Sequence, residues 1–187
     1  MSPSHYYLVS SLLPLRWGSR PPLSSADFLA QCEGQLSARD LADLRAVTLG
    51  PPEGREPRGA EARWHDWDGY VRNLIAGARA ALLRRDPADM LRPEREVFPS
   101  DRREIEEILA NDNPLERERA LDHCRWRQLE ELESGHPFDS DRLTVYRLKL
   151  LLLEKWAQFD AKNGERNLAE LVETGLQQAA EQRVASE

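Results

Sequence analysis

The stretch that decides the fold is "DSDRLTVYRLKLLLLEKWAQFD", residues 139–160. Apolar side chains recur there at the spacing of one helical face, and a second set covers most of the remaining surface. The first set is Leu143, Tyr146, Leu150, Leu153, Trp156 and Ala157, and the second is Leu148, Leu151, Leu152 and Phe159. A helix that is apolar nearly all round is buried by neighbours on several sides. We therefore expect this stretch to form the central helix of the domain.

The segments before this stretch also carry helical signals. Ser24 and Asp27 have the spacing of a capping box, and Asn113 followed by Pro114 is a typical helix start. Between them, one apolar stripe recurs at intervals of three and four: Trp64, Trp67, Val71, Leu74, Ile75, Ala78 and Leu82. No two strand-like runs are joined by a hairpin turn. The sequence predicts an all-α fold, an elongated set of antiparallel helices around residues 139–160.

The chain of 187 residues fits a single helical domain, residues 1–187, with three parts. They are an N-terminal aromatic segment with two short helices (1–49), a Pro/Gly hinge loop (50–63) and a helical body (64–187). The loop holds three glycines and three prolines, which favour irregular backbone. We expect the body to end in a further helix that carries Leu168, Leu171, Val172, Leu176 and Ala179.

The overall charge and the apolar runs restrict where the protein works. A formal net charge of -7 repels nucleic acid and anionic lipid, so neither is an expected partner. The run at the amino terminus is broken at Pro14 and follows no basic residue, unlike a secretory signal. No apolar run reaches the ~20 residues that cross a bilayer. With Cys32 and Cys124 far apart and read as buried thiols, the sequence predicts a cytoplasmic protein without a membrane span.

Motifs that would announce an enzyme are not found in this sequence. It contains no GxxxxGK[ST], GxGxxG or GxSxG pattern. The run His65 to Asp68 is interpreted as an exposed polar helix face. In Arg125-Trp126-Arg127 we expect a salt-bridged face in which Glu130 or Glu131 pairs with Arg127. The prediction is a protein that is not an enzyme and has no cofactor.

One cluster keeps an enzymatic alternative open. Asp122, His123 and Glu118 fall within six residues of one predicted helix and could form a metal site inside a helical bundle. The Glu-x-x-His pairs of di-iron bundles are missing, however, and Cys124 falls on the apolar stripe. We therefore predict no metal site, and keep a helical-bundle metalloenzyme as the weaker alternative.

Four aromatic residues crowd the amino-terminal part of the chain: Tyr6, Tyr7, Trp17 and Phe28. They can hold this segment against the body by packing into its core. They can also form a partner interface, because Tyr and Trp are enriched at the centres of protein interfaces. Both interpretations stay open, and different residues can serve different purposes.

The same region carries a family resemblance. The stretch "YYLVSSLLPLRWGSRPPLSSADFLAQCEGQLSARDLADL", residues 6–44, resembles the amino-terminal pattern of a small bacterial family of uncharacterised helical proteins. Their genes lie among those of V/A-type ATPases. The shared features are the paired tyrosines, the "LVSSL" run, a proline shortly after it, "PPLS" and the helix that follows.

This resemblance implies a shortened relative of the C-type adaptor of V/A-type ATPases, which is called the d-type adaptor in eukaryotes. That all-helical adaptor joins the central-stalk shaft to the membrane proteolipid ring, so both become expected partners, and ion or proton transport the expected process. Location would be cytoplasmic, peripheral at the inner membrane through the ATPase. This chain has about half the length of the C-type adaptor, which leaves room for only part of its funnel. A stand-alone helical scaffold or an assembly factor of the same complex is the alternative.

Overall fold

A computed structural model describes residues 3–52, 54–88, 91–92 and 99–159. Within these ranges the chain forms seven α helices and no strand, which confirms the all-α prediction. They are α1 (Pro3–Ser10), α2 (Ser25–Cys32), α3 (Ala38–Ala46), α4 (Gly59–Leu83), α5 (Pro99–Leu109), α6 (Pro114–Glu133) and α7 (Ser140–Gln158). The helix expected near Leu168 to Ala179 lies outside the described residues.

Helix α7 is the centre of the molecule, as the sequence predicted. It contacts α1, α2, α3, α4 and α6. Its buried residues point in every direction around the helix axis: Leu143, Val145, Tyr146, Leu148, Leu150, Leu152 and Leu153. Fully burying one leucine side chain contributes roughly 1.5–3 kcal/mol. The apolar content of α7 therefore requires neighbours on several sides, and the other helices supply them.

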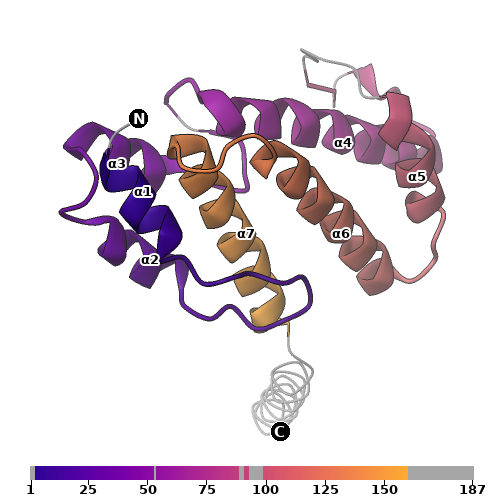
Figure 1. Cartoon of the computed structure of the whole chain (residues 1–187). Helices are drawn as coiled ribbons and strands as arrows, with labels where there is room; N and C mark the ends of the chain where they lie inside the picture. Colours follow the sequence, from indigo (N-terminus) through magenta and orange to yellow (C-terminus); the bar gives the residue numbers. More distant parts are fainter. Residues whose placement is uncertain (1–2, 53, 89–90, 93–98, 160–187) are drawn as a thin grey trace, which may run out of the picture.

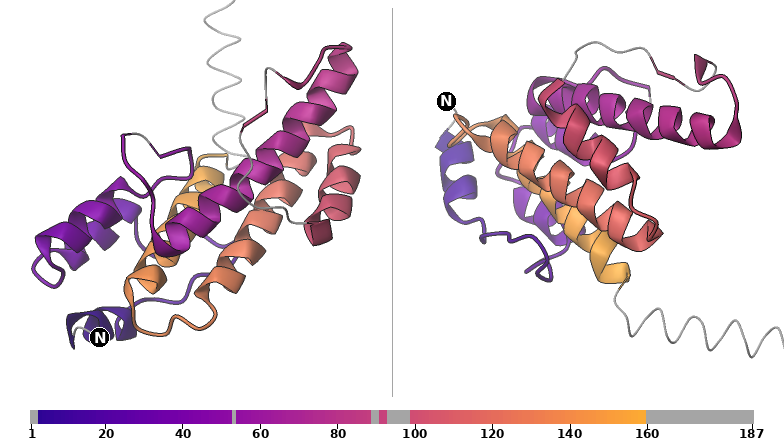
Figure 2. Two further views of the ribbon diagram at one scale, coloured as in Figure 1. Left: turned by 90° about the horizontal axis from the view of Figure 1, so that it is seen from above. Right: turned by 90° about the vertical axis from the view of Figure 1, so that its right-hand side faces the viewer.

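The remaining helices surround α7 in two groups (Figures 1 and 2). Helices α6 and α7 form a hairpin, and α4 lies obliquely across it, with α5 packed against α4 and α6. Helices α1, α2 and α3 cover the other side of α7. The oblique course of α4 departs from a purely antiparallel set, because α4 must bury one face against two helices at once.

Local signals account for the places where the helices begin. The Ser24 side chain accepts a hydrogen bond from the Asp27 amide, and the Asp27 carboxylate accepts one from the Ser24 amide, so the capping box is present. Asn113 caps α6 directly ahead of Pro114, as expected. Asp139 caps α7 by accepting from the Arg142 amide. These caps satisfy amide groups that a helix start leaves without partners.

Two expectations about α4 were wrong at its ends. The hinge loop was expected to extend to residue 63, but α4 begins at Gly59, and Ala60 and Glu61 are already buried in its first turn. An ion pair with Arg55 makes the burial of Glu61 possible. At the other end Leu82 was placed on the apolar stripe, yet it is 82% exposed, because α4 extends past the helices that cover its first turns.

None of the described helices is both long and apolar enough to cross a membrane. Even α7 is interrupted by charged residues such as Arg147, Lys149 and Glu154. The finding agrees with the expectation of no direct membrane span in this part of the chain.

The start of α4 provides a test of the fold. Gly59 has a φ of 55°, and a Cβ at this position would overlap the Asp141 side chain. We expect Gly59→Ala to lower the free energy of unfolding by about 1–2 kcal/mol, the cost of left-handed backbone for an L-residue. Urea denaturation followed by circular dichroism measures this change.

The matched control is Gly69→Ala in the interior of the same helix, where a Cβ would meet no other atom within 4 Å. This variant should raise the free energy of unfolding by roughly 0.5–1 kcal/mol, because alanine is the better helix former. Equal stability of both variants would contradict the described start of α4.

Candidate functional site

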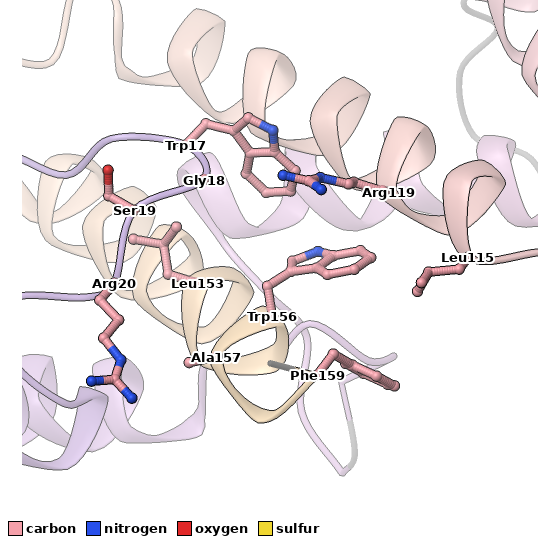
Figure 3. Close-up of a pocket in the computed structure, with 10 residues that line it drawn as sticks. All are labelled: Trp17, Gly18, Ser19, Arg20, Leu115, Arg119, Leu153, Trp156, Ala157 and Phe159. Atoms are coloured by element: carbon pink, nitrogen blue, oxygen red, sulfur yellow. The ribbon is translucent and has the colours of Figure 1, made fainter. Parts of the chain in front are cut away.

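An aromatic groove lies where the C-terminal end of α7 meets the start of α6 and the loop between α1 and α2 (Figure 3). Its volume is about 470 Å³. We call this surface the aromatic groove and define it by ten residues: Trp17, Gly18, Ser19, Arg20, Leu115, Arg119, Leu153, Trp156, Ala157 and Phe159. Its lining combines three aromatic rings with two arginines.

The rings of the groove pack on one another and leave its rim open. The Trp17 ring centroid lies 6.4 Å from that of Trp156 in an edge-to-face arrangement, and Trp156 lies 5.8 Å from Phe159. Phe159 and Leu115 are exposed, although both are large and apolar. An open aromatic surface of this kind is typical of a protein contact rather than of a closed core.

A buried carboxylate behind the groove fixes the orientation of Trp156. Its indole Nε1 donates a hydrogen bond of 2.8 Å to Asp122 Oδ2, which also accepts one of 2.7 Å from Lys155 Nζ. Asp122 is 0% exposed. Because buried hydrogen bonds to a charged acceptor are strong, Trp156 is held in place from inside the protein.

The same carboxylate belongs to a buried ionic cluster that joins three helices. Arg125 Nη1 lies 2.7 Å from Asp122 Oδ1 within α6, and Arg125 Nε lies 2.9 Å from Asp68 Oδ1 on α4. Lys155 connects Asp122 to α7. We call Asp68, Asp122, Arg125 and Lys155 the ionic clamp. It ties α4, α6 and α7 together at their common crossing.

The groups of the clamp and its neighbours are held in their charged forms. For Arg125, burial alone would lower the pKa, but the carboxylates of Asp68 and Asp122 outweigh burial and raise it above its ordinary value. For Glu118, burial raises the pKa, while the hydrogen bond and charge of Lys155 bring it below its usual range. Both groups are therefore ionised at neutral pH.

The residues of the metalloenzyme alternative meet differently than a metal site requires. Glu118 and Asp122 do come together, but both accept from Lys155 Nζ. The exposed imidazole of His123 instead packs against Trp17, with 5.8 Å between ring centroids. In the described ranges, no group of three His, Cys, Asp or Glu side chains is arranged to hold a metal ion. Cys124 is buried, as its place on the apolar stripe predicted.

Two sequence interpretations of charged runs were wrong. The run from His65 was expected to be an exposed face, but Asp68 is buried because Arg125 and Arg72 neutralise it. Arg127 does form an ion pair, but with Glu104 on α5 rather than with its own helix. Glu130 instead accepts from the Trp126 indole, at 2.8 Å.

The four aromatic residues proposed as a partner interface separate into distinct groups. Phe28 is fully buried against Tyr146, so it belongs to the core and not to a free surface. Trp17 is half-buried in the aromatic groove. Tyr6 and Tyr7 are 51% and 72% exposed on α1. The structure leaves Trp17 and the two tyrosines as candidate contacts.

A second apolar hollow, which the sequence did not suggest, lies between α4 and α5. Its volume is about 720 Å³. We call it the leucine groove; its larger apolar members are Leu74, Leu82, Leu91 and Leu109. It shares no lining residue with the aromatic groove. The protruding end of α4 was the available signal, since a stripe that outlasts its neighbours leaves leucines exposed.

Removal of one charge tests the ionic clamp. In Asp122→Asn, the buried Arg125 and Lys155 lose a charged partner, and we expect the free energy of unfolding to fall by about 3 kcal/mol or more. Urea denaturation provides the measurement. Glu107→Gln is the control, because its ion pair with Arg103 is exposed, and no measurable loss is expected. An Asp122→Asn protein as stable as the control would contradict the clamp.

Comparison with known proteins adds a family but no function. A family model described as "Protein of unknown function (DUF2764)" matches residues 61–178, a range that includes most of α4 and all of α5, α6 and α7. This match lies outside residues 6–44, and its description does not mention V/A-type ATPases. No curated protein and no solved structure matches the chain. Because the match covers well over half of its length, the chain belongs to the DUF2764 family.

Proposed function

We propose that this protein is a non-enzymatic helical adaptor of a bacterial V/A-type ATPase, similar to the C-type adaptor, between the central shaft and the proteolipid ring. The link to this complex rests on the resemblance of residues 6–44. The adaptor role is supported chiefly by one observation, the presence of two unconnected apolar grooves on a single clamped helical body.

An adaptor must bind two partners and keep them at a constant separation. The aromatic groove and the leucine groove are built from different elements, so they offer two independent contacts. Between them, α4, α6 and α7 are joined by the ionic clamp. A body held by buried ion pairs transmits force between its contacts with little deformation. Such a role requires no catalytic group.

The charge of the aromatic groove indicates the chemistry of its partner. Arg20 and Arg119 line it and are exposed, and neither makes a hydrogen bond or ion pair with another described residue. A partner segment with apolar side chains flanked by acidic ones would fill the groove and neutralise both arginines. On this proposal the groove takes such a segment of the shaft protein, and the leucine groove faces the ring.

Binding experiments with separate variants test this proposal. The full chain should co-elute with the purified shaft protein and with detergent-solubilised ring. Leu115→Glu with Phe159→Glu should abolish co-elution with the shaft, because both side chains are exposed at the aromatic groove. Leu82→Glu with Leu83→Glu should spare the shaft and weaken the ring contact.

Each pair of substitutions is the control for the other, since each adds two negative charges at exposed leucine or phenylalanine positions. Failure of the unaltered chain to bind either partner, where known components assemble, would overturn the adaptor proposal. Presence in the purified active ATPase would distinguish a permanent component from an assembly factor.

A further inference from the structure

A second polar feature of the clamp region is a pocket on the face opposite to its buried carboxylates. The pocket has a volume of about 420 Å³ and is formed by α4, α6, α7 and residues 49–50 and 92. Five basic side chains line it: Arg72, Arg79, Arg92, Arg125 and Lys155. Only two carboxylates, Glu118 and Asp122, share the lining. This concentration of positive charge is unexpected in a chain with a net charge of -7.

The charges of this region do not cancel among the described residues. Asp68 pairs with Arg72 and Arg125, Asp122 with Arg125 and Lys155, and Glu118 with Lys155. Three carboxylates are thus matched by three cations. Arg79 and Arg92 are left over, since no ion pair or side-chain hydrogen bond joins either guanidinium to a described residue. Arg79 is close enough to Glu118 to help lower the pKa of that carboxyl.

The position of Arg92 is set by a specific contact rather than by chance. The Asn73 side chain donates from Nδ2 to the Arg92 carbonyl at 3.0 Å and accepts from the Arg92 amide through Oδ1 at 2.9 Å. Asn73 is buried on α4, so this pair of hydrogen bonds holds residue 92 over the pocket.

A third unsatisfied group is found in the same lining. The indole Nε1 of Trp64 is buried and has no hydrogen-bond partner in the described part of the chain. A buried donor without a partner is costly and usually marks a bound acceptor or water. The unmatched groups of this pocket, two guanidiniums and one indole N–H, are all donors. The ligand that complements them is an anion rich in acceptor oxygens.

We propose that this pocket binds a small phosphorylated anion of the di- or triphosphate class. Guanidinium groups recognise phosphate oxygens through paired charged hydrogen bonds. Two surplus arginines match an anion with two or more negative charges, and the volume falls within the range of small-molecule sites. Free pyrophosphate and the phosphate chain of a nucleotide offer the same chemistry. This inference is independent of the proposed adaptor function.

Calorimetric titration of the full chain with pyrophosphate, at constant ionic strength, tests the site. We expect saturable one-to-one binding and a rise in the thermal midpoint, because the ligand binds only the folded state. Arg79→Gln with Arg92→Gln should weaken binding about tenfold or more, since each charged hydrogen bond contributes on that scale. Both side chains are exposed, so the variant should fold.

The matched control is Arg85→Gln with Arg103→Gln, which removes the same charge at exposed positions outside the pocket. Equal losses in the two variants would attribute binding to overall charge and overturn the site, as would no binding by the unaltered chain at millimolar pyrophosphate. Sulfate binding as tightly as pyrophosphate would also overturn the assignment. A parallel titration with ATP identifies the source: tighter binding of ATP indicates a nucleotide, and equal or weaker binding indicates free pyrophosphate.

Discussion

The carboxylate of Asp122 is the contact on which the rest of the structure depends. Its two oxygens accept from Arg125 on α6 and from Lys155 and Trp156 on α7. Through Arg125 it also reaches Asp68 on α4. Burying a single charge is strongly unfavourable, so these groups stay buried only while all of them remain paired. The requirement fixes the crossing of three helices in one arrangement, whereas apolar packing alone tolerates several.

Both hollows of the clamp region inherit their shape from this contact. On one side, Asp122 orients Trp156, which forms a wall of the aromatic groove. On the other, Arg125 and Lys155 line the basic pocket in the positions that Asp122 gives them. Lys155 and Trp156 are adjacent on α7 and donate to the same oxygen. Any movement of Lys155 toward a bound anion therefore changes the electrostatic environment of the Trp156 indole.

The fold was predictable from the sequence because its signals are local. The all-round apolar pattern of α7 requires burial on every side, and the caps at Ser24 and Asn113 depend on residues within three positions. The start of α4 escaped prediction because it rests on a distant contact. Gly59 lies against Asp141, 82 positions away, and no local pattern reveals that approach.

The candidate site was harder to predict for the same physical reason. Asp68 and Arg125 are 57 positions apart, and each taken alone has the appearance of a solvated surface residue. Phe28 was assigned to an interface because aromatic enrichment does not distinguish a core ring from an exposed one. Trp17 was singled out correctly as a member of a surface groove, but its partners Trp156 and Phe159 come from the far end of the described chain.

The pairing of charges also bears on the choice between an adaptor and an enzyme. A general acid or base needs a pKa near the working pH and access to a substrate. Asp122 has no exposed surface, and Glu118 has a pKa below its usual range because Lys155 and its arginine neighbours stabilise the charged form. These carboxylates are used to hold cations and, through them, helices. The groups of this region with unused bonding capacity are donors, which suits recognition of an anion better than proton transfer.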